Sequence, residues 1–375
     1  MQHARLSPSG SVRWLQCTKS VEMESAYGND TNSAAEWGTN VHHIGELLLK
    51  GENIVIGDTL QERGGESFIV DDEMLTCALD YANYVRGFID DKSTVLIEET
   101  FDLSFIAPDT FGTSDATVVN DTTLHVMDLK TGRNLVYAEN NTQLMLYALG
   151  ALHKVESEHY IDEVVLHIVQ SRVGHVDTWV TDVDALLEFE KFAKEQANSI
   201  ISGNTSYKPT AKGCMWCKHK AHCDTLRTYT ENIIKGDIDN LEDLDANVAN
   251  NTHIKQILDN KDLIIGFINA VEEVALEKLQ QGEDIDGYKV VESRTNRRWD
   301  KENEDKIEKY LVRKLKTSGA YKQTLISPTQ AIKKLDETGK KYVEKLIVKP
   351  KGKPTIVPIT DKRQSVSIAD GFDKC

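Results

Sequence analysis

The stretch TSDATVVNDTTLHVMDLK, residues 113–130, decides the fold. Residues 113–120 and 123–130 have the residue pattern of strands. Between them, Asn120-Asp121 is typical of a tight hairpin turn. Residues 94–103, TVLIEETFDL, have the same strand character. The sequence therefore predicts three consecutive strands, the last two of which form a hairpin.

The segments around these strands have the apolar spacing of helices and further strands. Helices are predicted at 34–50, 72–89, 138–153 and 182–202, and strands at 163–171 and 178–181. Residues 51–72 are polar and rich in glycine, which predicts a loop. Helices that alternate with strands in this way predict the α/β class, a mixed sheet flanked by helices.

The rest of the chain has a different pattern. Residues 229–285 are acidic and helical in spacing, and a strand at 287–294 and a helix at 300–315 are predicted after them. We expect two domains, 1–228 and 229–375, the second a mixed α+β appendage with a basic tail.

Composition indicates an ordinary globular protein. Of 375 residues, 40% are hydrophobic and 28% charged. No apolar run reaches the roughly 18 residues of a membrane span, and the N-terminus, MQHARLSPSG, lacks the apolar segment of a secretory signal. Six unevenly spaced cysteines do not fit a secreted disulfide framework. We therefore expect a cytoplasmic protein with no membrane partner.

Charge is distributed unevenly along the chain. The net charge is −16, but residues 301–375 hold 18 Lys+Arg against 10 Asp+Glu, a net of +8. The first 300 residues hold 26 against 50, a net of −24. An acidic body with a basic end hints at a polyanionic partner, although a solvated surface explains the same charges.

Two acidic residues fall on the predicted hairpin. Asp115 and Asp128 lie on its adjacent strands, and Lys130 points to the same face as Asp128 because side chains alternate along a strand. Carboxylates are ligands for Mg²⁺ or Mn²⁺, and such a cation activates water for attack on a phosphodiester. The lysine is placed to position that water or stabilise phosphate charge. A surface salt bridge is the alternative explanation of Asp-x-Lys.

Two helices add polar residues to this set. His42, on the helix before the strands, is a further candidate metal ligand, and Glu46 follows it by one helical turn. Gln143 and Tyr147 share a face of the helix after the strands and are candidates for orienting the lysine or a phosphate.

The order GxxxH, GxxD, DxK, QxxxY resembles the RecB/AddB-type branch of the PD-(D/E)XK nuclease superfamily, over residues 36–147. The resemblance implies that His42, Asp115 and Asp128 bind metal, with the Leu129 carbonyl as a further ligand. It also implies that Lys130 is catalytic, supported by Gln143 and Tyr147. Asp115 follows serine rather than the proline of the superfamily's name, and Glu98 or Glu99, on the preceding strand, is a further candidate for this site.

Four cysteines form a second constellation. Cys214, Cys217 and Cys223 are spaced C-x2-C-x5-C, and Cys17 lies far upstream. Four thiolates hold either a [4Fe–4S] cluster or a structural zinc ion, for which His222 is an alternative ligand to Cys223. The pattern resembles iron–sulfur members of the same nuclease branch, which implies a cluster that staples the two ends of the domain.

The chain also resembles, over nearly its full length, an uncharacterised phage and prophage family. This resemblance rests on an LSPS segment near the start, GYKVVESRTNRRW at 287–299 and VKPKGKPTIVP at 348–358. It implies a role in phage DNA metabolism within the bacterial host cytoplasm.

The C-terminal part holds candidate DNA contacts. Basic residues near an aromatic ring bind backbone phosphates and stack on bases, and a lysine-rich arm tracks phosphates. The candidates are Arg294, Arg297, Arg298, Trp299, Lys349, Lys351 and Lys353. A core tryptophan and a solvated basic face explain the same residues.

Two functional hypotheses follow. The first is a metal-dependent DNA exonuclease that resects single- or double-stranded phage DNA ends in recombination or replication, with a recombination or single-strand-binding protein as possible partner. The second is a non-catalytic DNA-binding or assembly module that keeps the nuclease fold. A zinc-stapled scaffold without a nucleic-acid role is a more distant third.

Overall fold

The computed structural model describes residues 4–28, 33–61, 67–235, 251–291 and parts of 306–346, namely 306, 308–310, 312–314, 332 and 335–346. The chain divides into two compact units, Met1–Gly282 and Glu283–Cys375. The boundary expected at residue 228 falls within helix α8 (Asp224–Lys235). Within the described ranges, no helix combines the length and the apolar character needed to cross a bilayer.

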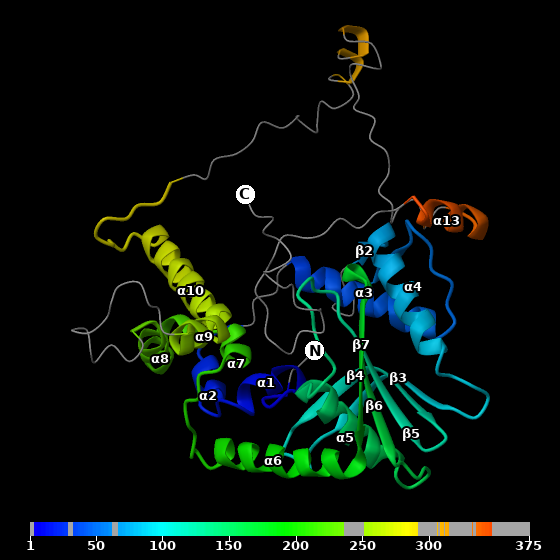
Figure 1. Cartoon of the computed structure of the whole chain (residues 1–375), viewed down its shortest axis with the longest axis horizontal. Helices are drawn as coiled ribbons and strands as arrows, with labels where there is room; N and C mark the ends of the chain where they lie inside the picture. Colours follow the sequence, from blue (N-terminus) through cyan, green and yellow to red (C-terminus); the bar gives the residue numbers. More distant parts are fainter. Residues whose placement is uncertain are drawn as a thin grey trace, which may run out of the picture. The chain divides into compact units, whose positions relative to one another are not determined.

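A five-stranded mixed sheet forms the centre of the first unit (Figure 1). Its strands are β3 (Thr94–Asp102), β4 (Phe111–Asn120), β5 (Thr123–Leu129), β6 (Glu163–Gln170) and β7 (His175–Asp182), in that spatial order. Only β5 and β6 are parallel; the other neighbours are antiparallel. The predicted α/β class and the 120–123 hairpin are confirmed, although β7 starts three residues before the predicted position of 178.

Helix α5 (Thr142–Val155) connects the parallel pair β5 and β6, because parallel strands need a crossover. The prediction that it starts at residue 138 is wrong. The Asn141 side chain accepts a hydrogen bond from Leu144 N at 3.2 Å and caps the helix, while Ala138 N donates to Asp177 Oδ2 at 2.9 Å. Residues 131–141 therefore form a loop.

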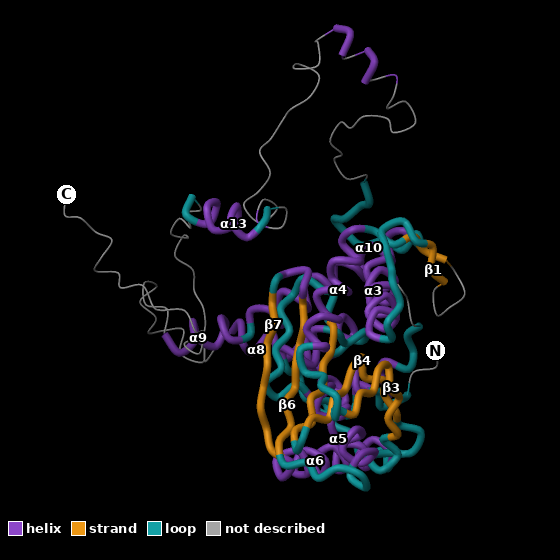
Figure 2. Tube along the Cα trace, turned by 90° about the vertical axis from the view of Figure 1, so that its right-hand side faces the viewer, coloured by secondary structure: helices purple, strands orange, loops and turns teal. Residues whose placement is uncertain are grey.

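Helices cover both faces of the sheet, with α3 (Ser33–Leu49) and α4 (Asp72–Arg86) on one side and α5 and α6 (Val183–Ile201) on the other (Figure 2). Side chains of β5 alternate between the two faces of the sheet, so this strand contributes to a hydrophobic core on each face. Leu124 and Val126 pack with the α5 side, whereas Met127 and Leu129 pack with the α3–α4 side. The predicted helices at 34–50, 72–89 and 182–202 agree with these to within three residues.

Residues 51–72, predicted as a loop, contain a short antiparallel ribbon. Its strands are β1 (Thr59–Gln61) and β2 (Ser67–Ile69). Leu60 and Phe68 pair across it and pack against the α3–α4 core. A single apolar residue in each strand does not produce the alternation of apolar and polar residues by which a strand is predicted from sequence.

Helices form the two ends of the first unit. The N-terminal ones are η1 (Pro8–Gly10), α1 (Ser11–Trp14) and α2 (Ser20–Glu24). The C-terminal ones are α7 (Ala211–Met215), η3 (Lys220–His222), α8, α9 (Asn251–Asp259) and α10 (Lys261–Gln280). A further short helix, η2 (Ser171–Val173), joins β6 to β7.

In the second unit, helix α13 covers Glu337–Glu344. The strand predicted at 287–294 is wrong for its described part, residues 287–291, which is a turn followed by irregular backbone. Gly287 has a φ of +80°, and Tyr288 and Val291 are largely exposed, so their apolar character reflects no buried strand here.

Candidate functional site

Asp115 and Asp128 meet at the centre of the sheet. Ala116 pairs with Met127 across β4 and β5, so the two aspartates are the next residues on facing strands. Asp115 Oδ2 accepts a hydrogen bond from Leu129 N at 2.7 Å, so this carboxylate binds the neighbouring strand. Both side chains are shielded from solvent, with exposed fractions of 14% and 4%.

The two carboxylates are in different electrostatic environments. Burial by itself would raise the pKa of Asp115, but His42 and the Leu129 amide together hold that pKa below its ordinary value. Burial raises the pKa of Asp128, and the opposing charge of Lys130 does not cancel the effect. Burial opposes protonation of His42, but Asp115 outweighs it and raises the pKa of His42.

His42 reaches this site from α3. Its Nδ1 donates to Asp115 Oδ1 at 3.0 Å. Glu46, one turn further along, does not join it; this carboxylate pairs with His43 at 3.3 Å and Lys50 at 2.7 Å. The i, i+4 spacing placed Glu46 on the same side of the helix as His42, but its carboxylate contacts these two residues of the same helix.

Glu98 completes a group of possible metal ligands. One ligand atom each from His42, Glu98 and Asp115 lie within 4.8 Å of one another. Glu98 has a φ of +50° inside β3, although its neighbours pair normally with β4. The left-handed conformation is unfavourable for a non-glycine residue by about 1 kcal/mol or more, and such backbone strain concentrates at functional sites. Glu99 instead forms an ion pair with Lys154.

A second polar network adjoins the carboxylates. Lys130 Nζ lies 2.8 Å from Asp128 Oδ2 and donates to Gln143 Oε1 at 3.0 Å. Gln143 Nε2 donates to Asp128 Oδ1 at 3.3 Å and to the Tyr147 hydroxyl at 3.0 Å. The structure therefore brings together Asp128, Lys130, Gln143 and Tyr147, with Gln143 in the first turn of α5 at the centre.

Burial raises the pKa of Tyr147, so its hydroxyl keeps its proton and can both donate and accept hydrogen bonds. Lys130 N donates to Val169 O at 2.9 Å, which anchors the end of β5 against β6. Leu129, whose carbonyl is a predicted ligand, lies between Asp128 and Lys130 at the end of β5.

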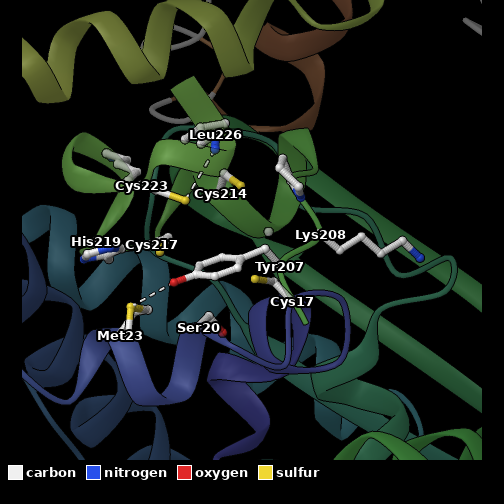
Figure 3. Close-up of a pocket in the computed structure, with 13 residues that line it drawn as sticks. Cys17, Ser20, Met23, Tyr207, Lys208, Cys214, Cys217, His219, Cys223 and Leu226 are labelled. Atoms are coloured by element: carbon white, nitrogen blue, oxygen red, sulfur yellow. Dashed lines mark hydrogen bonds between the residues drawn. The ribbon is translucent and has the colours of Figure 1, made fainter. Parts of the chain in front are cut away.

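The four predicted cysteines line one cavity (Figure 3). Cys17 comes from the N-terminal segment, Cys214 from α7, Cys217 from the turn after it, and Cys223 from the residue before α8. Burial raises the pKa of Cys214 and raises that of Cys217 to about 12. His222 is not among the residues that line this cavity, although His219 is.

Other contacts hold the same two chain segments together. Ser206 N donates to Thr18 Oγ1 at 2.8 Å, and Lys19 N donates to Ser206 O at 3.2 Å. Lys218 N donates to Glu24 Oε1 at 2.9 Å. The cysteine cavity is thus the junction between residues 17–24 and 206–226. Of the other cysteines, Cys77 is buried in the α3–α4 core.

The candidate DNA contacts of the C-terminal part lie outside the described residues. These are Arg294, Arg297, Arg298, Trp299, Lys349, Lys351 and Lys353. Their role stays a prediction.

Comparison with known proteins identifies similar solved structures and a family. The solved structure "Crystal structure of SSO0001" is 14% identical, with a TM-score of 0.28, over 58% of this chain and 85% of that one. The family match extends over residues 3–364, nearly the whole chain, in agreement with the full-length resemblance to an uncharacterised family. The chain therefore belongs to the family described as "Protein of unknown function (DUF2800)".

Proposed function

We propose that this chain is a metal-dependent nuclease of the PD-(D/E)XK type that hydrolyses phosphodiester bonds at DNA ends. The observation that carries the proposal is the donor group His42, Glu98 and Asp115, adjacent to the Asp128–Lys130 pair. Three antiparallel strands, a crossover helix and a parallel fourth strand support the fold assignment, because they present these residues at one place in the sheet.

The donor set fits a divalent cation. It offers one imidazole nitrogen and two carboxylates within 4.8 Å of one another, and carboxylate oxygens suit Mg²⁺ and Mn²⁺. Asp128 and the Leu129 carbonyl remain proposed additional ligands. When bound, the cation would neutralise phosphate charge and lower the pKa of a water molecule.

The chain's own residues then hold the remaining groups in place. Lys130 carries a positive charge that Gln143 and Asp128 keep in one position, which suits it to a phosphate oxygen or to the attacking water. Gln143 bridges Lys130, Asp128 and Tyr147, so it fixes the lysine without adding charge. The Asp115 bond to Leu129 N keeps its carboxylate directed at the site.

The test is a cleavage assay. The full chain, purified anaerobically, is given end-labelled linear and closed circular DNA with Mn²⁺ or Mg²⁺, beside Lys130→Ala and Asp115→Asn. Loss of linear DNA only, abolished in both variants, supports an exonuclease; Lys154→Ala, which removes a cation that pairs with Glu99 and not with this network, should keep activity. Cleavage of the circle would indicate an endonuclease. Metal-independent DNA binding without any cleavage would favour the non-catalytic module.

For the four cysteines we propose a [4Fe–4S] cluster that joins the two ends of the nuclease domain. All four cysteines line one cavity, and four thiolates are the usual ligand set of a [4Fe–4S] cluster. A zinc ion bound by the same cysteines is the alternative.

Colour and metal content test this proposal. An oxidised cluster makes the protein brown, with iron and acid-labile sulfide, whereas a zinc protein is colourless. Cys217→Ser should lose colour and iron together, and Cys77→Ser, a change in the α3–α4 core, should keep both. Stoichiometric zinc in colourless, anaerobically purified protein would overturn the cluster proposal.

For the cellular role, we propose resection of phage DNA ends for recombination or replication in the bacterial host cytoplasm, with a recombination or single-strand-binding protein as partner.

A further inference from the structure

The loop 131–141 begins directly after Lys130 and presents two large apolar side chains to solvent. Leu135 is 52% exposed and Tyr137 is 56% exposed. Single exposed apolar residues are common on protein surfaces. These two lie two residues apart, on a loop that starts at the catalytic lysine of the proposed site and ends at the cap of α5.

The loop is held rigidly by one buried side chain. Gln170, at the end of β6, is fully buried. Its Oε1 accepts a hydrogen bond from Val136 N at 2.8 Å, and its Nε2 donates to Gly132 O at 3.1 Å and to Asn134 O at 2.9 Å. A single amide therefore satisfies three backbone groups of the loop and fixes its path.

Side chains from the β6–β7 region hold the rest of the loop. His175 Nε2 donates to Val136 O at 2.9 Å, and Asp177 Oδ2 accepts from Ala138 N at 2.9 Å. The Tyr137 ring meets His175 edge-on, with ring centroids 5.4 Å apart and an interplanar angle of 78°. This contact sets the plane of the tyrosine ring while leaving more than half of the side chain open to solvent.

A rigid loop with exposed apolar side chains is typical of a contact surface, because the loop loses little conformational entropy when a partner binds. Its surroundings indicate which partner. Lys130 precedes the loop, and the loop itself carries the exposed Arg133 on one side of Tyr137 and the exposed Glu139 on the other. Aromatic rings interleaved with cations bind nucleic-acid bases by stacking and phosphates by charge, without sequence preference.

A base offers a free face to an aromatic ring only when its strand is unpaired, since a duplex keeps that face stacked. We propose that Tyr137 is a stacking platform and Leu135 an apolar neighbour for unpaired nucleotides that enter the site. This inference rests on the proposed function and refines it, because it assigns single-stranded DNA, or the frayed end of a duplex, as the substrate.

The test measures binding separately from cleavage. The full-length protein in EDTA, which prevents hydrolysis, is titrated with a single-stranded oligonucleotide that carries 2-aminopurine, whose fluorescence falls on stacking. Tyr137→Ala should weaken binding about 5- to 100-fold and remove the quenching, in line with the loss of one stacked base. Tyr137→Phe keeps the ring and should bind as the wild type does, while Leu135→Ala should weaken binding less.

Tyr160→Ala is the matched control. Tyr160 is 76% exposed and precedes β6, at the opposite end of that strand from Gln170, so its removal should leave binding unchanged. The inference is overturned if Tyr137→Ala binds the single strand normally, or if it loses affinity for a blunt duplex by the same factor. Failure of the wild type to cleave DNA with Mn²⁺ would reject the nuclease and leave the binding result standing.

Discussion

Lowering the pH from 7 to 5 should cost the first unit about 2 kcal/mol of unfolding free energy through one histidine. His167 on β6 is 1% exposed, and burial lowers its pKa to about 3 from the ordinary 6.5. The Tyr84 hydroxyl lies 2.9 Å from His167 Nδ1, and His125 Nδ1 lies 3.1 Å from His167 Nε2. A neutral ring satisfies both contacts, accepting at Nδ1 and donating at Nε2.

The sign follows from the direction of the shift. Because the folded pKa lies below the unfolded one, protons bind more readily to the unfolded chain between pH 6.5 and about 3. Stability is therefore complete above pH 6.5 and falls as the pH decreases through this window. A pH of 5 lies about 1.5 units below the pKa of the histidine in the unfolded chain. This difference corresponds to about 2 kcal/mol, at 1.36 kcal/mol per unit.

Urea unfolding of the wild type and of His167→Gln, measured from pH 7 to pH 5, checks the prediction. The variant starts less stable because it changes a buried contact, but it should lose about 2 kcal/mol less than the wild type over this range. His125, whose pKa burial also lowers, is present in both proteins. Parallel declines in the two proteins would refute the assignment to His167.

Three further predictions concern packing, metal binding and capping. Gly150→Ala should lower the unfolding free energy, measured in urea, by about 1–2 kcal/mol. The new Cβ would lie 2.5 Å from Phe101 Cβ, and this crowding outweighs a gain of about 1 kcal/mol in helix propensity. Unchanged stability would contradict the close packing of α5 on β3. Glu98→Gln should weaken Mn²⁺ binding, measured by calorimetric titration, at least 10-fold, whereas Glu99→Gln should leave the affinity unchanged. Equal losses of affinity in the two variants would show that Glu98 is not a metal ligand. Asp182→Ala should cost about 1 kcal/mol by removing the N-cap of α6, and a loss below a few tenths would show that the cap bond to Ala185 N at 2.7 Å contributes little.

Local patterns in the chain predicted the elements of the sheet well. Residues such as Val118, Val119 and Val126 alternate or cluster as strands require, and Asn120-Asp121 marks the hairpin. These signals act within a few residues, so they need no knowledge of distant contacts. The start of α5 was less accurate, because the backbone N–H of Ala138 donates to Asp177 on another strand and the helix begins only after its cap, Asn141.

The motif order also placed Asp115, Asp128, Lys130, Gln143 and Tyr147 in one neighbourhood, since a hairpin followed by a crossover helix brings them to the same part of a sheet. The sequence could not choose between adjacent glutamates. Side chains at 98 and 99 leave a strand on opposite faces, and the face that meets the site is set by the register with β4 and by the left-handed backbone at Glu98.

By itself, then, the sequence determined the class of the fold, the strands and most helices, and the residue types of both constellations, because these depend on short-range periodicity and spacing. Only the tertiary structure decided that Glu98 joins His42 and that Gln170 fixes the loop after Lys130. Each of these depends on contacts between segments distant in the chain, whose energy is realised only when the whole sheet and its helices have packed.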